Sequence, residues 1–423
     1  MMEQTKLVPK RRFKEFQNAH GWEQRELGKV VDLVKSYSLS RDVETDEDSS
    51  FRYVHYGDIH KKVADLIESD EQLPMIKAGD YESLQKGDVI VADASEDYTG
   101  IAEPAVLLNK PSAKVVAGLH TIAMRPKEIT PLFLYYLLHT DNFKSYGTRV
   151  GTGMKVFGIT TNNLFKYPAA LPVKEEQEEI GKFFYDLDNL ITLHQRKLDK
   201  TKALKSAYLT VMFPAEGERK PKRRFAGFTD SWEQCNLGDL MEISSASRVH
   251  KNEWTKSGVP FFRSSDVVSE FKGIENNKAY ISQSLFEKLS IKSGRVKKGD
   301  VLVTGGGSIG IPYLVKNDNP LYFKDADLIW LKSSETTTNG NFLYTFFITP
   351  FFRNYVKSIT HIGTISHYTI EQAKVTPIRI PTKKEQTKIG SFFANLDHLI
   401  TLRKRKLEKL QNLKKAYLNE MFV

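Results

Sequence analysis

Apolar residues recur at spacings of three, four and seven along two stretches of the chain, and each stretch follows a proline. The first follows Pro172 and contains Ile180, Phe183, Phe184, Leu187, Leu190, Ile191, Leu198, Tyr208 and Met212. The second follows Pro381 and contains Ile389, Phe392, Phe393, Leu396, Leu399, Ile400, Leu407 and Tyr417. Side chains at this spacing lie near one stripe of an α-helix. The pattern predicts two long amphipathic helices, within 172–214 and 381–423.

Each predicted helix is too long to bury its stripe within a small domain. A helix of about 38 residues spans about 57 Å. We therefore expect the two copies to bury their stripes against each other, as an antiparallel coiled coil. The residues expected at this contact are Ile180, Phe184, Leu187, Ile191, Leu198, Ile389, Phe393, Leu396, Ile400 and Leu407.

The two helices belong to an internal repeat of the chain. Pro172–Phe213 aligns with Pro381–Phe422 without a gap, and more than half of the aligned positions are identical. Upstream, "PKRRF" occurs at Pro9 and again at Pro221, and each copy is followed by "WEQ", from Trp22 and Trp232, which we interpret as core anchors. Between these matched ends the sequences diverge. The repeat predicts two tandem halves that share one architecture and present two different surfaces.

The divergent regions have the pattern of mixed α/β domains. Short β-branched and aromatic runs such as "GDVIVAD" are bounded by Gly, Pro, Asp and Asn, as strands are. The fold class expected is α/β (α+β), with two mixed domains separated by two long antiparallel coiled-coil helices and related by a pseudo-twofold repeat. The expected boundaries are a first globular domain over 1–171, a helix over 172–214, a linker over 215–222, a second globular domain over 223–380 and a helix over 381–423.

Charge and cysteine content narrow the classes of partner. With 62 Lys plus Arg against 52 Asp plus Glu, the formal net charge is +10, which favours an anionic partner without deciding its identity. The single cysteine, Cys235, excludes an intramolecular disulfide and a Cys-rich zinc site. No apolar run approaches membrane-spanning length, and the first residues lack the apolar core of a signal peptide. We expect a cytoplasmic protein without a membrane partner.

The sequence lacks the signatures of an amino-methyltransferase turn, a phosphate-binding loop and a metal site. "DNPLY", Asp318–Tyr322, lacks the second proline of an amino-methyltransferase turn and is interpreted as a surface turn. "GGGSIG", Gly305–Gly310, lacks the GKS or GKT ending of a phosphate-binding loop, so it is either a turn that lets the backbone approach DNA or a plain loop. The ten histidines form no HExxH motif, and we expect no metal site and no catalytic residue.

The order of these segments resembles a known family. A variable region, the "LPVKEEQEEIGKFFYDLDNLI" helix, a second variable region and the "IPTKKEQTKIGSFFANLDHLI" helix are similar to the specificity subunit of type I restriction-modification systems. "GDVLVTGGGSIGIPYLV", from Gly299 to Val315, adds to the resemblance, which covers the whole chain in architecture. The family often has two prolines where this chain has "LPV" and "IPT", but one proline suffices to start a helix.

The resemblance implies a protein that binds double-stranded DNA at a bipartite site. Each variable region would be a target recognition domain that binds one half-site in the major groove, and the helices would set the spacer. The expected partners are two modification subunits, which bind S-adenosylmethionine and methylate adenine, and restriction subunits, which use ATP and Mg²⁺. We expect no cofactor to be bound by this chain itself.

Residues that contact DNA are expected in the loops ahead of each long helix and in the glycine-rich turn, because polar, basic and glycine residues there suit base edges and phosphates. These candidates are Arg149, Thr152, Lys155, Phe157, Gly306, Ser308, Thr364, Ser366, His367 and Tyr368. The alternative is that the loops only join each domain to its helix. The two "PKRRF" segments are interpreted either as phosphate-gripping or as solvated charge runs.

Two functions of other classes stay open at this point. One is a self-contained DNA adenine methyltransferase, which would need the missing Asn-Pro-Pro-Tyr-like turn. The other is a coiled-coil scaffold that binds proteins alone.

Overall fold

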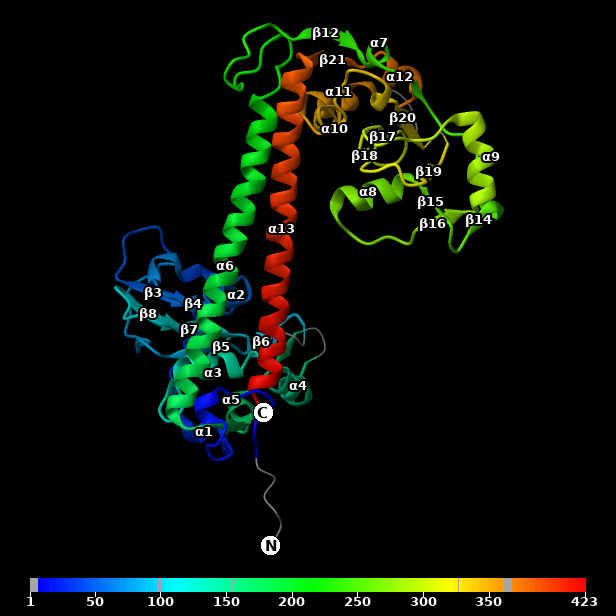
Figure 1. The fold of residues 1–423 in the computed structure, drawn as a ribbon. Helices are drawn as coiled ribbons and strands as arrows, with labels where there is room; N and C mark the ends of the chain where they lie inside the picture. The colour runs from blue at the N-terminus through cyan, green and yellow to red at the C-terminus, as the bar shows by residue number, and fades with distance from the viewer. Residues whose placement is uncertain (1–6, 98–99, 154–155, 326, 361–366) are drawn as a thin grey trace. The chain divides into compact units, whose positions relative to one another are not determined.

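The computed structural model describes residues 7–97, 100–153, 156–325, 327–360 and 367–423 (Figure 1). The chain divides into two compact units. The first consists of Met1–Gln195 with Arg405–Val423, and the second of Arg196–Lys404. Each long helix therefore contributes one end to each unit. The mixed α/β fold with two long helices confirms the expected fold class.

A five-stranded sheet forms the centre of the first unit, in the order β2-β9-β5-β7-β4. The strand β4 runs parallel to β7, and the other neighbours are antiparallel. Its strands are β2 (Val31–Val34), β9 (Thr121–Pro126), β5 (Val89–Ala92), β7 (Pro104–Leu107) and β4 (Leu66–Ile67). Every residue of β5 is buried, as expected of a central strand with both faces covered.

Three strand pairs complete this unit. They are β1 (Glu23–Glu26) with β11 (Pro168–Leu171), β3 (Phe51–Val54) with β8 (Lys114–Ala117), and β6 (Ala94–Ser95) with β10 (Phe157–Gly158). Its short helices are α1 (Leu27–Val30), α2 (Tyr56–His60), α3 (Pro131–Leu137), α4 (Asp141–Val150) and α5 (Thr161–Phe165).

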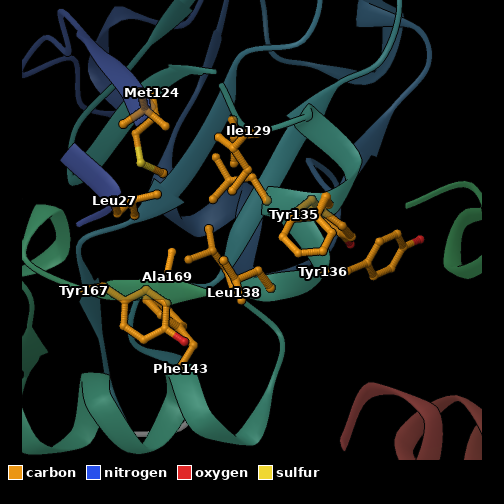
Figure 2. Close-up of a cluster of buried hydrophobic side chains, with 14 of the residues drawn as sticks. Leu27, Met124, Ile129, Tyr135, Tyr136, Leu138, Phe143, Tyr167 and Ala169 are labelled. Atoms are coloured by element: carbon orange, nitrogen blue, oxygen red, sulfur yellow. The ribbon is translucent and has the colours of Figure 1, made fainter. Parts of the chain in front are cut away.

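Aromatic and aliphatic side chains from sheet and helices form one core in the first unit (Figure 2). Figure 2 shows Tyr135, Tyr136 and Phe143 among the residues of this core. Trp22 is buried in it and packs edge-on against Phe133, which confirms its interpretation as a core anchor. The same core includes Ile180 and Phe184 from the first long helix, Met421 from the end of the second, and Phe422 directly after it.

The second unit contains two four-stranded sheets and one strand pair. The first sheet has the order β13 (Ile243–Ser244), β20 (Leu328–Leu331), β17 (Val301–Thr304), β18 (Pro312–Leu314). The second has the order β14 (Trp254–Thr255), β16 (Ala279–Ile281), β15 (Val259–Phe262), β19 (Tyr322–Phe323). The pair is β12 (Glu233–Asn236) with β21 (Pro377–Ile380). The helices are α7 (Leu237–Leu240), α8 (Ser264–Lys272), α9 (Gln283–Ser293), α10 (Gly340–Phe347), α11 (Pro350–Thr360) and α12 (Ile370–Lys374).

The two units share one framework around their central strands. In the first, β5 lies between β9 and β7, and in the second β17 lies between β20 and β18, with antiparallel pairing throughout. Trp232 is buried beside Phe342, as Trp22 is beside Phe133. The peripheral strands differ between the units, which matches the divergence of the two sequences.

The long helices α6 (Lys174–Val211) and α13 (Lys383–Met421) pack antiparallel within each unit. In the first unit, the Phe183 and Tyr417 rings lie 5.5 Å apart, and Lys414 forms an ion pair with Asp188 at 2.6 Å. In the second unit, equivalent positions meet: Tyr208 contacts Phe392, and Lys205 pairs with Asp397. The expected contact residues Ile180, Phe184, Leu187, Leu198, Ile389, Phe393, Leu396 and Leu407 are buried, and Ile191 and Ile400 are partly buried.

A polar contact that the apolar pattern did not reveal lies along the same stripe in the second unit. The Arg403 Nη1 atom donates hydrogen bonds to the Thr201 hydroxyl and to the Lys197 carbonyl oxygen. Thr201 is buried. The stripe is therefore not purely apolar: besides the two ion pairs, it contains this contact between a guanidinium and a hydroxyl group.

Candidate nucleic-acid interface

The glycine-rich segment after β17 forms a tight loop with an exposed apex. The Ile311 N–H donates to the Thr304 hydroxyl at 2.8 Å, and the Gly310 N–H donates to the Thr304 carbonyl oxygen at 2.8 Å. Gly307 has φ 69°, and a Cβ atom there would meet no atom within 4 Å. Gly307 and Ser308 are exposed, whereas Gly306 is buried. Ser308 is thus presented to solvent by a loop that is fixed at its base.

The same loop contacts the segment ahead of α12. The Tyr368 N–H donates to the Gly305 carbonyl oxygen at 2.7 Å, and a Cβ atom at Gly306 would lie 3.5 Å from the His367 ring. His367 is exposed. The structure therefore brings together the glycine-rich turn and the loop before the long helix, which were predicted separately.

Tyr368 requires a correction as a DNA-contact residue. Its side chain is 1% exposed, and its hydroxyl shares a 2.6 Å hydrogen bond with the Thr376 hydroxyl. Burial raises the pKa of the Tyr368 phenol above its usual value. Tyr368 supports the loop from inside the core. Thr364 and Ser366 lie outside the described residues.

Two further segments meet this loop at the Asp327 carbonyl oxygen, one through a main-chain and one through a side-chain hydrogen bond. The Gly305 N–H donates to the Asp327 carbonyl oxygen at 2.8 Å, and the Ser264 hydroxyl donates to the same oxygen at 3.0 Å. Ser264 begins α8, directly after β15, and Asp327 precedes β20. We call this meeting of the segments after β15, after β17, before β20 and before α12 the junction of the second unit.

The first unit contains an equivalent junction. The Asp93 N–H donates to the His120 carbonyl oxygen at 3.0 Å, and the Ile159 N–H donates to the Asp93 carbonyl oxygen at 2.9 Å. They correspond to two hydrogen bonds of the second unit, from the Gly305 N–H to the Asp327 carbonyl oxygen and from the Tyr368 N–H to the Gly305 carbonyl oxygen. Two unlike sequences thus form the same pair of main-chain hydrogen bonds at Asp93 and at Gly305, which we call the main-chain crossing of each junction.

The predicted loop of the first unit lies at its junction. Phe157 pairs with Ser95 in the β10–β6 ladder, and it is partly buried. The Thr152 N–H donates to the Gly158 carbonyl oxygen at 3.0 Å, and Thr152 is exposed. Arg149 is exposed at the end of α4, with its guanidinium 5.6 Å from the centre of the Tyr146 ring. Lys155 lies outside the described residues.

Four side chains at this junction were missed by the sequence analysis. The His120 Nδ1 and Asp93 Oδ1 atoms are 3.1 Å apart, and His120 is half exposed. The Tyr56 ring contacts His120 edge-on at 5.3 Å and His60 at 6.0 Å. Tyr56 and His60 are the first and last residues of α2, whereas Asp93 follows β5 and His120 precedes β9, so no local spacing connects the three segments. Only their positions at strand ends could have indicated a surface site.

The "PKRRF" segments are structural and do not grip phosphates through their second arginine. Arg12 makes two hydrogen bonds to the Glu176 carboxylate at 2.6 and 2.7 Å, and Arg224 makes two to Glu385 at 2.7 Å. The Arg12 and Glu176 side chains are 5% and 0% exposed. A guanidinium that is buried and paired in this way is not accessible to DNA. Neither the phosphate interpretation nor the solvated-run interpretation holds for Arg12 and Arg224.

Within the described ranges, no group of three or more His, Cys, Asp or Glu residues could hold a metal ion. No helix among those residues is long and apolar enough to cross a membrane. In the "DNPLY" stretch, Asp318, Asn319 and Pro320 are exposed, and Asp318 accepts a hydrogen bond from the Lys298 N–H at 2.8 Å. The surface-turn interpretation holds only for these three residues, because Leu321 and Tyr322 are buried and Tyr322 begins β19.

The repeat with its two junctions is matched twice by one family model. The model for the type I restriction modification DNA specificity domain matches residues 19–203 and again residues 229–412. The chain belongs to this family. It is a type I restriction-modification specificity subunit, and the match supports neither the self-contained methyltransferase nor the protein-only scaffold.

Relatives of this specificity subunit match over most of their length. A type I restriction enzyme specificity subunit of Haemophilus influenzae is 27% identical over 288 residues, which cover 68% of this chain and 69% of the relative. The MjaX specificity subunit of Methanocaldococcus jannaschii is 23% identical over 432 residues, which cover 94% of this chain and 92% of the relative.

Solved structures share the fold of this specificity subunit. The S subunit of a type I restriction-modification system from M. genitalium superposes with a TM-score of 0.60 over 99% of both chains, at 14% identity. A chain from a structural study of complex assembly in the type I system gives a TM-score of 0.52 at 17% identity, over 95% of this chain and 97% of that chain.

Proposed function

We propose that this specificity subunit is non-catalytic and reads a bipartite site on double-stranded DNA, with one half-site bound by each unit. The observation that supports this most is the pair of junctions. The same main-chain crossing occurs in both units, at Asp93 and at Gly305, while the side chains around it differ. One backbone framework with two unlike surfaces suits a protein that reads two unlike half-sites.

The side chains at each junction are suited to base edges and phosphates. In the first unit they include Asp93, which can accept a hydrogen bond from a cytosine or adenine amino group, and the rings of Tyr56 and His120. In the second unit they include Ser308 and His367, beside a glycine apex that lets the backbone approach closely. Arg149 and Thr152 remain candidates in the first unit.

The long helices carry an apolar surface suited to docking protein partners. Leu190, Leu193, Leu204, Leu399 and Leu402 are exposed, and Leu413 is partly exposed. The helix repeat relates Leu190 to Leu399, Leu193 to Leu402 and Leu204 to Leu413. The first unit thus presents Leu190, Leu193 and Leu413, and the second presents the equivalent three leucines. Two like patches would bind two copies of one partner.

We assign these patches to two modification subunits, which would bind S-adenosylmethionine and methylate adenine. Restriction subunits, which use ATP and Mg²⁺, would complete the assembly. In this proposal the chain itself binds no cofactor, and its chemical contribution is recognition.

Replacing residues 223–380 with the second variable region of another family member tests the proposal. The hybrid and the wild type would each be expressed with the modification subunit, and methylated adenines would be mapped across the host genome. We expect one half-site of the methylated motif to change and the other to stay the same. A change in both half-sites would refute independent reading, and a chain that binds no double-stranded DNA would refute the proposed function.

A further inference from the structure

Arg353 holds an unusual position for a positive charge in the second unit. It lies in α11, is partly buried, and its Nη1 atom donates to the carbonyl oxygens of Ile309 at 3.1 Å and Gly310 at 3.0 Å. The preceding residue, Phe352, packs beneath the same loop, since a Cβ atom at Gly310 would lie 2.9 Å from its ring. The Arg353 guanidinium therefore contacts the glycine-rich loop at Ile309 and Gly310, and the His367 ring lies near the same loop at Gly306.

Arg353 has no anionic partner in the described part of the chain. Carbonyl oxygens accept both of its hydrogen bonds, and none of the described carboxylates forms an ion pair with it. Its Nε and Nη2 atoms make no hydrogen bond to those residues, and the Arg353 side chain is only partly buried. Burial lowers the pKa of the guanidinium, with no carboxylate to offset the effect. A partly desolvated cation of this kind costs folding free energy unless an anion pairs with it.

The first unit has a cation at the equivalent position and supplies it with a carboxylate. Thr140 caps the start of α4 as Thr349 caps the start of α11. Lys144 and Arg353 each lie four residues after the cap and donate their N–H to its carbonyl oxygen, so Lys144 corresponds to Arg353. The Lys144 Nζ atom lies 3.9 Å from a carboxylate oxygen of Glu103. Glu103 also pairs with Lys62 at 2.6 Å. The first unit therefore supplies a carboxylate of its own beside this cation.

An isoleucine takes the place of this carboxylate in the second unit. The Ala92 N–H donates to the Glu103 carbonyl oxygen, and the Thr304 N–H donates to the Ile311 carbonyl oxygen, each at 3.0 Å. Ile311 therefore corresponds to Glu103. The framework is the same in both units, but only the second leaves its cation without a negative partner.

We propose that Arg353 binds a DNA backbone phosphate through its Nε and Nη2 atoms while its Nη1 atom fixes the loop at Ile309 and Gly310. The inference rests on the proposed DNA-recognition function and assigns this contact to the second unit alone. A guanidinium presents a planar fork of donors that matches a phosphate. The exposed, side-chain-free apex at Gly307 lets the sugar-phosphate backbone approach the same loop.

The test compares the salt dependence of DNA binding in three variants of the full-length chain, assembled with its modification subunits. The probe is a duplex that carries the site mapped by adenine methylation. Arg353→Met removes the charge and keeps an apolar stem, whereas Arg353→Lys keeps the charge. Lys144→Met removes the equivalent cation of the first unit, and thermal unfolding of each variant verifies the fold.

We expect Arg353→Met to weaken binding by about tenfold, because a charge-assisted hydrogen bond is lost. The plot of log K against log salt concentration should become shallower by about 0.9, the value for one phosphate contact. Arg353→Lys should keep the wild-type slope. Lys144→Met should also keep the wild-type slope, because the Lys144 charge already has the Glu103 carboxylate beside it.

Three results would overturn the inference, and they differ from failure of the proposed function. An Arg353→Met variant that binds more weakly with an unchanged slope would mean that Arg353 only supports the loop. If Arg353→Met and Lys144→Met made the salt-dependence plot shallower by the same amount, the phosphate contact would not be specific to the second unit. If Arg353→Lys also made the plot shallower, loss of the positive charge could not explain the effect of Arg353→Met. If the wild-type assembly ignored double-stranded DNA, the proposed function itself would fail.

Discussion

The two buried arginine–glutamate pairs at the starts of the long helices should be the most sensitive polar contacts in the fold. Arg12 uses Nε and Nη2 on the Glu176 carboxylate, and it donates further hydrogen bonds to the carbonyl oxygens of Ala19 and His20 at 3.1 Å. The pair ties the segment before β1 to the first turn of α6. The perturbation is Glu176→Gln, which keeps the shape of the side chain and removes its charge.

The expected loss follows from the burial of both partners. With Arg12 5% and Glu176 0% exposed, removing the carboxylate charge leaves a guanidinium in a desolvated site with mainly carbonyl acceptors. Breaking such a buried pair costs about 3–5 kcal/mol. The Arg224 and Glu385 side chains are 14% and 1% exposed, so Glu385→Gln should cost less, at about 2–4 kcal/mol. Replacing both partners, as in Arg12→Met with Glu176→Leu, should restore part of the stability, because no buried charge is left unpaired.

Urea unfolding followed by far-UV circular dichroism measures these losses, with Glu179→Gln as the control. Glu179 is exposed on the same helix, so its variant should lie within about 0.5 kcal/mol of wild type. A Glu176→Gln variant that lost less than about 1 kcal/mol would refute the reasoning. So would a double variant that was less stable than the single one.

Three further predictions concern the helices and the acid stability of the first unit. Inserting one heptad into each long helix preserves the seven-residue pattern and should lengthen the unspecified gap of the methylated motif; an unchanged gap in methylation mapping would contradict this. Leu190→Asp with Leu193→Asp should reduce the modification subunits bound per chain from two to one, as measured by light scattering, whereas full loss or full retention would exclude two separate patches. Burial raises the pKa of Glu103, but the hydrogen bond and charge of His139 and Lys62 outweigh it and hold the pKa well below its usual value. Glu103 therefore stabilises the fold above the ordinary glutamate pKa, and this contribution is lost as pH falls below it, so unfolding of Glu103→Gln should depend less on pH between neutral pH and about pH 3.

The long helices were predictable because their evidence is local and repeated. Spacings of three and four over many turns determine which face of a helix is apolar, and two copies confirm each other. The observed helices, Lys174–Val211 and Lys383–Met421, lie within the predicted segments. The sequence did not predict that Arg403 and Thr201 meet on the stripe, because two polar residues in an apolar pattern do not reveal that they are partners.

The candidate interface was predictable only where it is continuous in the chain. The glycine-rich turn and the loops before the helices stood out by composition, and the structure joins the turn to the His367 segment. Asp93 and His120 are brought together by strands whose order no local pattern fixes. Tyr368 was misplaced for the opposite reason: it lies in the correct segment, but alternation along that segment turns its ring into the core.

The way each junction is built explains how one framework can support two different surfaces. Its crossings at Asp93 and Gly305 are held mainly by main-chain hydrogen bonds, which do not depend on the identity of the side chains. Substitutions on the exposed side of a junction can therefore change what is read without changing how the domain folds. Charged positions beneath the surface lack this freedom, because each buried charge needs a partner. Glu103 is that partner in the first unit, whereas Ile311 in the second unit gives Arg353 no counter-charge, and in our proposal a DNA phosphate supplies it. On this reasoning, changing Ile311 to Glu should give the second unit its own counter-charge and reduce the salt dependence of DNA binding as Arg353→Met does.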